Sequence, residues 1–191
     1  PATVTAVANA SCQAAVPNLL NNLAASDNCT PAETLTKIQN PAAGTLVSPG
    51  THTITVTVTD GAGNSRTCTT TLTATNSPPI NVSAGGPYTV NEGSSVIVTA
   101  AGNDPEGGTL SLAWDLDNNG TFEAPGQSVS FSAVALDGPG SRTIKVQISD
   151  NCGLSTTAQT TVTVQNIAPT ANFPGSVINE GGAATLTFIN Q

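Results

Sequence analysis

The chain of 191 residues has twelve acidic side chains against four basic ones, giving a formal net charge of -8, and only 8% of its residues are charged. This acidity argues against nucleic acid and against an anionic membrane surface as partners, and no apolar run approaches the roughly 20 residues of a membrane-spanning helix, so we expect no membrane insertion. Four cysteines without a CxxC motif or a Cys/His cluster indicate structural disulfides in an extracellular or cell-surface, oxidising setting.

The first predicted strand covers residues 3–7. Residues 12–28 have no clean period and include Pro17, so they are predicted as loop with one short helical turn near residues 19–23. A second strand is predicted at residues 35–39, before a Pro- and Gly-rich turn.

Residues 50–76 recur ninety positions later, at residues 140–166, without a gap. The apolar positions and the turn aspartate correspond in the two copies: Ile54, Val56, Val58 and Asp60 fall on Ile144, Val146, Ile148 and Asp150. Each copy alternates apolar and polar residues, turns through a Gly-containing segment and alternates again, which predicts a hairpin of two half-buried strands. The ninety-residue period predicts two domains and a remainder.

Residues 1–76 resemble the hyalin repeat or HYR domain, an immunoglobulin-like β-sandwich of secreted and cell-surface proteins. The resemblance rests on DNC at residues 27–29, on PAAGTLVSPG at residues 41–50 and on GTHTITVTVTDGAGNSRTC at residues 50–68. It implies a disulfide between two inner cysteines, here Cys12 and Cys29. The family's first cysteine, which pairs with its last, is absent, because the sequence starts at Pro1, where that Cys-Pro would be cut in half.

Cys68 occupies the last cysteine position of this family. Three alternatives stay open for it: a buried free thiol on the Leu72 face of its strand, a partner just upstream of Pro1, or a bond to Cys152. Cys152 lies in a predicted turn and has no counterpart in the first copy of the hairpin.

The residues 76–79, Asn-Ser-Pro-Pro, are predicted as a short, stiff linker. Seven short strands separated by turns follow, as a β-sandwich requires. They are predicted at residues 80–84, 88–90, 95–101, 110–116, 128–133, 142–149 and 156–164.

The second predicted domain resembles the PKD domain, named after the polycystic kidney disease protein. The resemblance rests on GGPYTVNEGSSV at residues 85–96, on NDPEGGTLSLAWDLDNNG at residues 103–120 and on the final hairpin. PKD domains serve as stalk, adhesion and accessory modules. The likeness spans residues 78–166 and implies that Trp114 is the core tryptophan, with Leu112 and Leu116 on its face. We therefore expect an HYR-like domain at residues 1–76 and a PKD-like domain at residues 77–167.

Residues 168–191 restart the pattern, because Asn179-Glu180-Gly181 repeats Asn91-Glu92-Gly93. About two strands cannot bury their own apolar face. Three explanations of the tail stay open. It belongs to an incomplete third repeat in an excerpt from a longer chain, it is disordered, or it completes the sheet of an identical chain by strand addition. We prefer the first.

The clearest chemical motif is Asp115-Leu-Asp117-Asn-Asn119-Gly120, the first half of a D-x-[DN]-x-[DN]-G calcium loop. Gly126 stands where such a loop has its bidentate Glu, so an acidic turn without metal is the alternative. The PKD resemblance places three further candidate calcium ligands near the ends of the sandwich: Glu92, Asp104 and Asp150. Calcium there would stiffen a stalk.

Catalysis finds little support in this sequence. The only histidine, His52, is expected to be a polar residue at a strand start, and no nucleophile or phosphate-loop motif is present. With one Trp and one Tyr, the aromatic walls of a glycosidase cleft are hard to build.

We therefore expect an all-β chain of tandem immunoglobulin-like sandwiches that is not an enzyme, from a prokaryotic extracellular or cell-surface protein. Its expected role is a structural or adhesive spacer in a stalk, adhesin or filament, in contact with neighbouring repeats of the same or identical chains. The alternative is an accessory module of a secreted hydrolase, which an exposed row of aromatic residues would favour. Candidate glycosylation sequons stand at Asn9, Asn28, Asn81 and Asn119.

Overall fold

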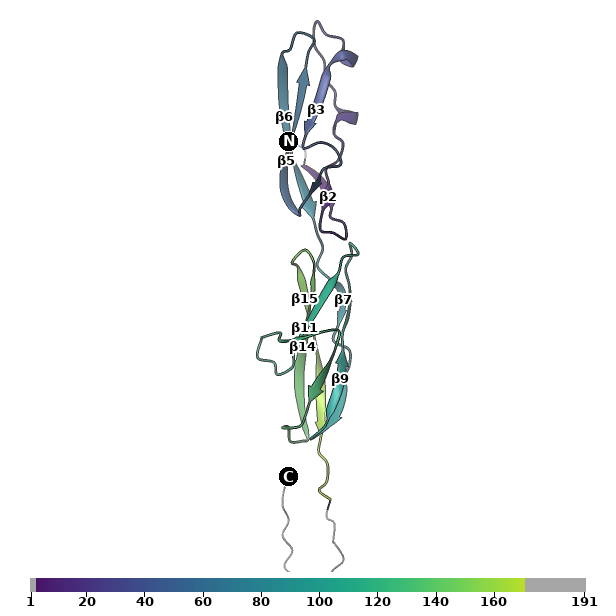
Figure 1. The fold of residues 1–191 in the computed structure, drawn as a ribbon, viewed down its shortest axis with the longest axis vertical. Coiled ribbons are helices and arrows are strands. Elements are labelled where there is room, and N and C mark those ends of the chain that lie inside the picture. Colours follow the sequence, from purple (N-terminus) through teal and green to yellow (C-terminus); the bar gives the residue numbers. More distant parts are fainter. Residues whose placement is uncertain (1–2, 171–191) are drawn as a thin grey trace, which may run out of the picture.

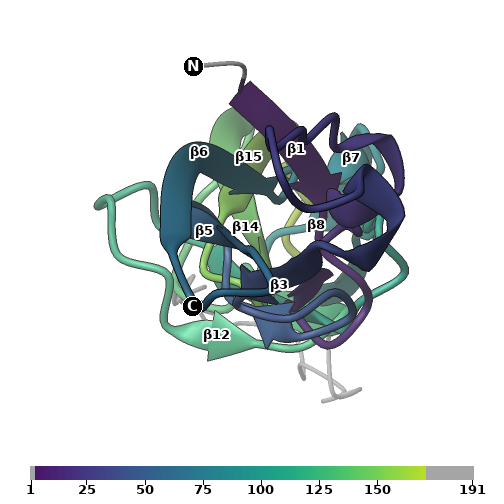
Figure 2. The same cartoon turned by 90° about the horizontal axis from the view of Figure 1, so that it is seen from above.

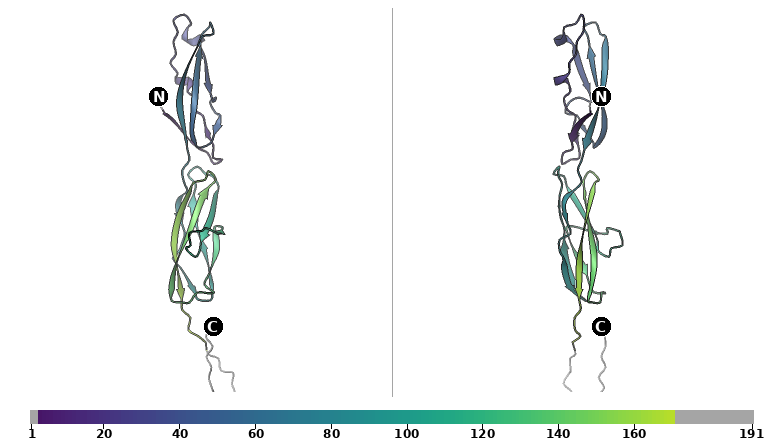
Figure 3. Two further views of the ribbon diagram at one scale, coloured as in Figure 1. Left: turned by 90° about the vertical axis from the view of Figure 1, so that its left-hand side faces the viewer. Right: turned by 180° about the vertical axis from the view of Figure 1, so that it is seen from behind.

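The computed structural model describes residues 3–170, which form two units of β-strands joined near residue 76. The units lie end to end along the longest axis of the molecule (Figures 1 and 3), so that their strands overlap in a view down that axis (Figure 2). The elements of the first unit are β1 Thr3–Val7, β2 Ala14–Ala15, η1 Leu20–Asn22, η2 Ala32–Thr34, β3 Thr36–Asn40, β4 Leu46–Val47, β5 Gly50–Thr59 and β6 Ser65–Thr75.

The first unit is a four-stranded sheet in the order β1-β6-β5-β3, in which only β1 runs parallel to its neighbour β6. The opposite layer is small, since it contains one short strand pair, β2 with β4, and otherwise turns and loop. A compact cluster of Val16, Ile54 and Leu72 joins the two layers. The unit therefore buries little apolar surface for its length.

In this thin layer, the side chain of Gln39 satisfies backbone groups that strand pairing would otherwise satisfy. Its side chain is buried; Oε1 accepts from the Leu19 backbone N–H at 2.8 Å, and Nε2 donates to the Pro17 carbonyl at 2.9 Å. A buried amide is tolerated because its groups find partners. One side chain of β3 thus holds the loop over the inner face of the sheet.

The second unit is larger. Its elements are β7 Ile80–Ser83, β8 Tyr88–Asn91, β9 Ser95–Thr99, β10 Ala101–Asn103, β11 Leu110–Asp115, β12 Ala124–Pro125, β13 Ser128–Ser132, β14 Gly140–Asp150 and β15 Ser155–Gln165. Strands β12-β11-β14-β15-β8 form a five-stranded sheet, and the pairs β10-β7 and β13-β9 form the other layer. Trp114 is fully buried in the core between them, with Leu112 and Leu116 packed against it, as expected.

The two hairpins are structural equivalents. Val56 lies opposite Cys68 in the β5–β6 pair, and Val146 lies opposite Ala158 in the β14–β15 pair. The parallel first strands correspond as well, because Val4 pairs with Leu72 and Tyr88 pairs with Val162. The sequence repeat is therefore a repeat of strand register.

The chain is an all-β tandem of immunoglobulin-like β-sandwiches, as predicted. The predicted strands are confirmed to within one or two residues at their ends, except that residues 95–101 are divided between β9 and β10. The sequence did not indicate the short strands β2, β4 and β12 or the second 3-10 turn. The expected third repeat at residues 168–191 lies almost entirely outside the described residues.

Candidate functional site

The two units are covalently joined by a disulfide between Cys12 and Cys152, whose Cα atoms are 5.4 Å apart and which are separated by 140 residues in the sequence. Cys12 lies in the loop between β1 and β2, and Cys152 lies in the turn between β14 and β15. The bridge therefore holds the end of the first sandwich against the hairpin tip of the second.

The expected bridge between Cys12 and Cys29 is wrong, since Cys29 is free and exposed. The two residues belong to opposite ends of the first unit. Cys12 follows β1 at the junction, whereas the turn after Asp27 contacts the distal hairpin, where the Gly61 N–H donates to Thr30 Oγ1 at 3.4 Å. The intervening strand β5 has ten residues, which span roughly 30 Å.

Cys68 is also free, and it is exposed rather than buried as one alternative had it. It lies opposite Val56 on β6, beyond the part of β6 that pairs with β1 in the described residues. A bond from Cys68 to Cys152 is not formed, because Cys152 is bonded to Cys12.

The hairpin turn that carries Cys152 is organised by Asp150. Its Oδ1 accepts from the backbone N–H groups of Cys152 and Leu154 at 2.9 and 2.8 Å. Asp60 holds the equivalent turn of the first unit in the same way, at 2.9 and 2.8 Å from the N–H groups of Ala62 and Asn64. Both turns need a glycine at positive φ, +90° at Gly63 and +93° at Gly153.

The second turn differs from the first because its remaining polar groups form hydrogen bonds to the linker and to the first unit. Asp150 Oδ2 accepts from Asn76 Nδ2 in the linker at 2.8 Å, and Asn151 Nδ2 donates to the Ala10 carbonyl of the first unit at 2.9 Å. Asp150 is buried, with 7% of its surface exposed. Two hydrogen bonds thus flank the disulfide and fix the linker as well as the loop.

The sequence contained a signal for this junction that the family resemblance obscured. Cys152 stands where the first copy has Ala62, and Asn151 stands where it has Gly61. A cysteine added at the tip of a repeated turn has no partner within its own unit. Asn76 and Asn151 were not among the predicted site residues.

Two buried oxygens in the second unit and its linker lack a hydrogen-bond donor: Asn76 Oδ1 and Glu106 Oε2. Asp104, Asn151 and the Ala10 carbonyl converge around the position that a side chain on Gly108 would occupy. Asp104 Oδ1 accepts from the Glu106 N–H at 2.7 Å. The junction is therefore rich in oxygen atoms, and Gly108 leaves space beside them.

The structure distributes the six predicted metal ligands over separate places. Asp115, Asp117 and Asn119 share one loop, Asp104 and Asp150 belong to the end that faces the first unit, and Glu92 lies after β8. Within the described residues, no three acidic, cysteine or histidine side chains come close enough together to hold a metal ion.

The loop after β11 is held by its own carboxylates. Asp115 is fully buried; its Oδ1 accepts from the Asn119 N–H at 3.1 Å and its Oδ2 from the Gly120 N–H at 3.0 Å. Asp117 Oδ1 accepts from the Asn119 N–H at 3.2 Å and Asp117 Oδ2 from Asn119 Nδ2 at 3.0 Å. These carboxylates already serve the loop as hydrogen-bond acceptors.

Glu92 ties together the opposite end of the second unit. Its Oε1 accepts from the Ile167 N–H at 2.8 Å, and its Oε2 accepts from the Gly138 N–H at 2.7 Å. These two donors, Ile167 first, lower the pKa of Glu92 from its ordinary value. The carboxylate fixes the segment that leaves β15.

Acid is expected to weaken this contact. Because the pKa of Glu92 is lowered in the folded protein, its stabilising contribution is complete above the ordinary pKa and is lost as the pH falls through the folded value. Melting temperatures measured from pH 7 down to pH 3 should therefore fall less for Glu92→Gln than for the unchanged protein. Glu33→Gln, which removes the same charge from a 3-10 turn of the first unit, is the control. Parallel curves for the unchanged protein and Glu92→Gln would contradict the assignment.

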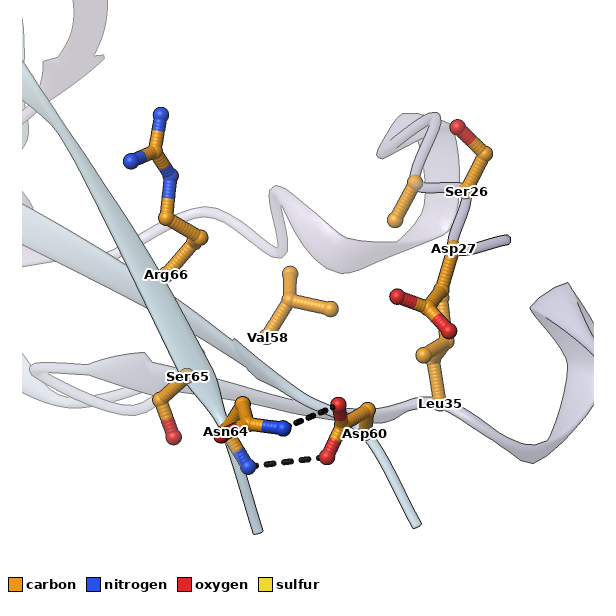
Figure 4. A pocket seen from close by; sticks show the side chains of 9 residues that line it. Ser26, Asp27, Leu35, Val58, Asp60, Asn64, Ser65 and Arg66 are labelled. Atoms are coloured by element: carbon orange, nitrogen blue, oxygen red, sulfur yellow. Dashed lines mark hydrogen bonds between the residues drawn. The ribbon is translucent and has the colours of Figure 1, made fainter. Parts of the chain in front are cut away.

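A pocket of about 400 Å³ lies at the distal end of the first unit (Figure 4). Asp27 and Asp60 enter it from different segments, and Arg66 extends away from both carboxylates. The Cys29 and Thr30 N–H groups lower the pKa of Asp27, and the Asn64 side chain, then its N–H, lowers that of Asp60. Both acids are thus ionised and accept hydrogen bonds within their own turns.

His52 lies near the start of β5. Its Nε2 donates to the Ser48 carbonyl at 2.8 Å, which places it as a polar residue beside a turn. In the described part of the chain, no helix has the length and apolar character that crossing a membrane demands.

Residues 76–163 match a family model described as a bacterial Ig domain. No protein with a curated description matches the chain. Among solved structures, the chain is similar to the fibronectin(III)-like modules of Clostridium thermocellum CbhA, with 14% identity, 90% of this chain and 95% of that chain covered, and a TM-score of 0.40.

Two other solved structures are similar to the chain at a comparably low level. The PKD1 domain of Vibrio anguillarum Epp is 23% identical, with 49% of this chain and 100% of that chain covered and a TM-score of 0.36. DIP-gamma IG1+IG2 is 11% identical with a TM-score of 0.36, and the match spans 60% of either chain. Similarities of this size do not bear on function.

Proposed function

Since residues 76–163 form a bacterial Ig-like domain that is bonded to a second sandwich, we propose that the chain is a structural or adhesive module of an extracellular prokaryotic repeat protein. In this proposal the two units act as a stiff spacer without catalysis. Residues 1–76 form an HYR-like unit, residues 77–167 form a PKD-like unit, and residues 168–191 begin a third. The partners are neighbouring repeats of the same or identical chains, including by strand addition through the tail.

The disulfide between the units carries this proposal. A linker of four residues, even with two prolines, leaves two domains some freedom to change their relative angle, and weak contacts between domains make such motion the default. A covalent bond at a second point, flanked by the Asn151 and Asn76 hydrogen bonds, removes most of that freedom. Stiffness between repeats is what a stalk or filament requires of its units. The bond also forms most readily in an oxidising, extracellular setting.

Small-angle X-ray scattering tests the spacer function. The oxidised monomer is expected to fit one extended shape, because the disulfide and the two hydrogen bonds beside it fix the angle between the units. Adding a reducing agent should widen the distribution of maximum dimensions while far-ultraviolet circular dichroism stays constant. A compact shape for the oxidised protein, or a wide range of shapes before reduction, would rule out a stiff spacer.

The alternative role, an accessory module that holds substrate for a secreted hydrolase, lacks a supporting observation. An exposed row of aromatic side chains would favour it. The exposed large apolar side chains of the described residues are all aliphatic: Val7, Ile38, Leu46, Ile80, Ile97, Val134, Leu154 and Ile167.

Calcium is proposed at the end of the second unit that faces the first, with Asp104 and Asp150 as acidic ligands. The buried Oδ1 of Asn76, which has no hydrogen-bond donor, supports this place, since the amide nitrogen of the same side chain is hydrogen-bonded to Asp150 Oδ2. Hard cations such as calcium take amide, carbonyl and carboxylate oxygens. An ion there would add a further restraint to the disulfide and the two hydrogen bonds of the junction.

Thermal melting with calcium and with chelator tests this metal. Calcium is expected to raise the melting temperature by several degrees in the unchanged protein and not in Asp104→Asn, because the added ion binds only the folded junction. Asp117→Asn serves as the control and should keep the response. Equal melting temperatures with calcium and with chelator would remove the metal from the proposal.

A further inference from the structure

Asn119 and Gly120 form the only Asn-Gly pair in the sequence. When glycine follows asparagine, its backbone nitrogen can attack the side-chain carbonyl carbon of the asparagine, because no Cβ on the glycine hinders the approach. Three features promote this attack: a base on the attacking N–H, a donor to the carbonyl oxygen, and access for water. The loop after β11 offers all three.

Asp115 supplies the base. Its Oδ2 accepts from the Gly120 N–H at 3.0 Å, so the proton that must leave the attacking nitrogen already points at a carboxylate. Asp115 is fully buried, and its Oδ1 is fixed by the Asn119 N–H at 3.1 Å. A positioned carboxylate within hydrogen-bond distance is the geometry of general-base catalysis.

Two hydrogen bonds fix the side chain of Asn119. Its Oδ1 accepts from the Thr121 N–H at 2.7 Å, which closes an Asx turn and folds the carbonyl back over the following residues. The same N–H stabilises the negative charge that develops on Oδ1 during attack. Asn119 Nδ2, the leaving nitrogen, donates to Asp117 Oδ2 at 3.0 Å.

Water has free access to this site. Asn119 and Gly120 are both exposed, and nothing lies within 4 Å of the position where a Cβ on Gly120 would be. The loop stands out from the side of the second unit between β11 and β12 (Figure 1).

We propose that Asn119 is a self-modifying residue, which the folded loop converts through a succinimide to aspartate and isoaspartate. The Gly120 nitrogen gives its proton to Asp115 and bonds to the Asn119 side-chain carbonyl carbon. The bond from that carbon to Nδ2 breaks, and the proton from Asp115 leaves with it as ammonia. Water then opens the ring at either carbonyl, and no oxidant or reductant takes part.

The product changes the chemistry of the loop. A neutral amide becomes a carboxylate beside Asp115 and Asp117, so the motif gains a third acid at alternate positions. Modified and unmodified molecules therefore differ by one negative charge at an exposed point on the side of the spacer. This inference does not rest on the proposed function.

Mass spectrometry of the full chain tests the proposal. Incubation at pH 8 and 37 °C is expected to add about 1 Da, localised to Asn119 by peptide mapping, and to give an isoaspartate fraction. Asp115→Asn keeps an acceptor for one of the two loop N–H groups but no base, so conversion should slow on the order of tenfold or more. Glu123→Gln, in the same loop without contact to the reacting atoms, should convert at the unchanged rate.

A comparison with the unfolded chain makes the test independent of whether Asp115→Asn folds. Because the folded loop supplies the base and the donor, conversion in buffer should be faster than in concentrated urea at the same pH. The proposal fails if no mass is gained at Asn119, if the urea-unfolded chain converts at least as fast, or if a folded Asp115→Asn variant keeps the original rate.

Discussion

Trp114→Ala is expected to lower the free energy of unfolding of the second unit by about 3–5 kcal/mol, the usual cost of emptying a large aromatic site. The side chain is fully buried and is surrounded by residues of both layers. Its Nε1 also donates to the Gly126 carbonyl at 3.1 Å. Since single domains are stable by only about 5–15 kcal/mol, much of the stability of the unit depends on this residue.

Urea unfolding followed by far-ultraviolet circular dichroism measures this effect, because the variant has lost the only tryptophan and cannot be followed by its fluorescence. Trp114→Phe separates the two contributions. It keeps most of the apolar volume but leaves the Gly126 carbonyl without a donor, which costs about 1–3 kcal/mol. Val134→Ala, at a side chain that is 68% exposed, is the control and should change little. A loss below about 1 kcal/mol for Trp114→Ala would show that Trp114 is not the centre of the core.

The strands were predictable because each hairpin expresses the same two rules. Apolar residues alternate along β5 and β14 because one face of each strand is buried. An aspartate followed three residues later by glycine closes each turn, since the carboxylate accepts turn N–H groups and glycine takes the positive φ. Both rules act within a few residues, so a sequence displays them.

The layer opposite the first sheet was less predictable. Residues 12–28 were expected to be loop with one short helical turn near residues 19–23; η1 confirms that turn, and the structure adds only β2 in that part. Its order comes from Gln39, which lies about twenty residues away and satisfies the backbone groups of the loop. A contact at that separation leaves no local pattern to detect.

The predicted disulfide pairing was wrong for the same reason, because the true partner lies 140 residues away. A pairing rule carried over from a family assumes that each unit satisfies its own cysteines, and Cys12 instead crosses to the next unit. For the predicted metal ligands, the local spacing was present but fits more than one role. Asp115 and Asp117 have calcium-type spacing, yet their oxygens hold the loop N–H groups. Spacing alone therefore does not distinguish a ligand from a turn-forming acid.

Removing the bridge between the units is expected to produce the other large change in stability. The disulfide closes a stretch of 140 residues, and loss of a native disulfide typically costs about 2–5 kcal/mol. The first unit should bear most of this loss, because its core cluster is much smaller than that of the second. In the double variant Cys12→Ser/Cys152→Ser, calorimetry should therefore show an early transition for the first unit, separated from a later one for the second.

The double variant is preferable to a single substitution, since a single substitution leaves an unpaired thiol at Cys12 or Cys152 that can form disulfides between molecules. Cys68→Ser is the control, because Cys68 is free and exposed, and its melting curve should match the original. If the double variant also melts as the original does, the Asn151–Ala10 and Asn76–Asp150 hydrogen bonds are sufficient for the junction. The stiffness of the spacer would then come from polar contacts that a reducing environment does not remove.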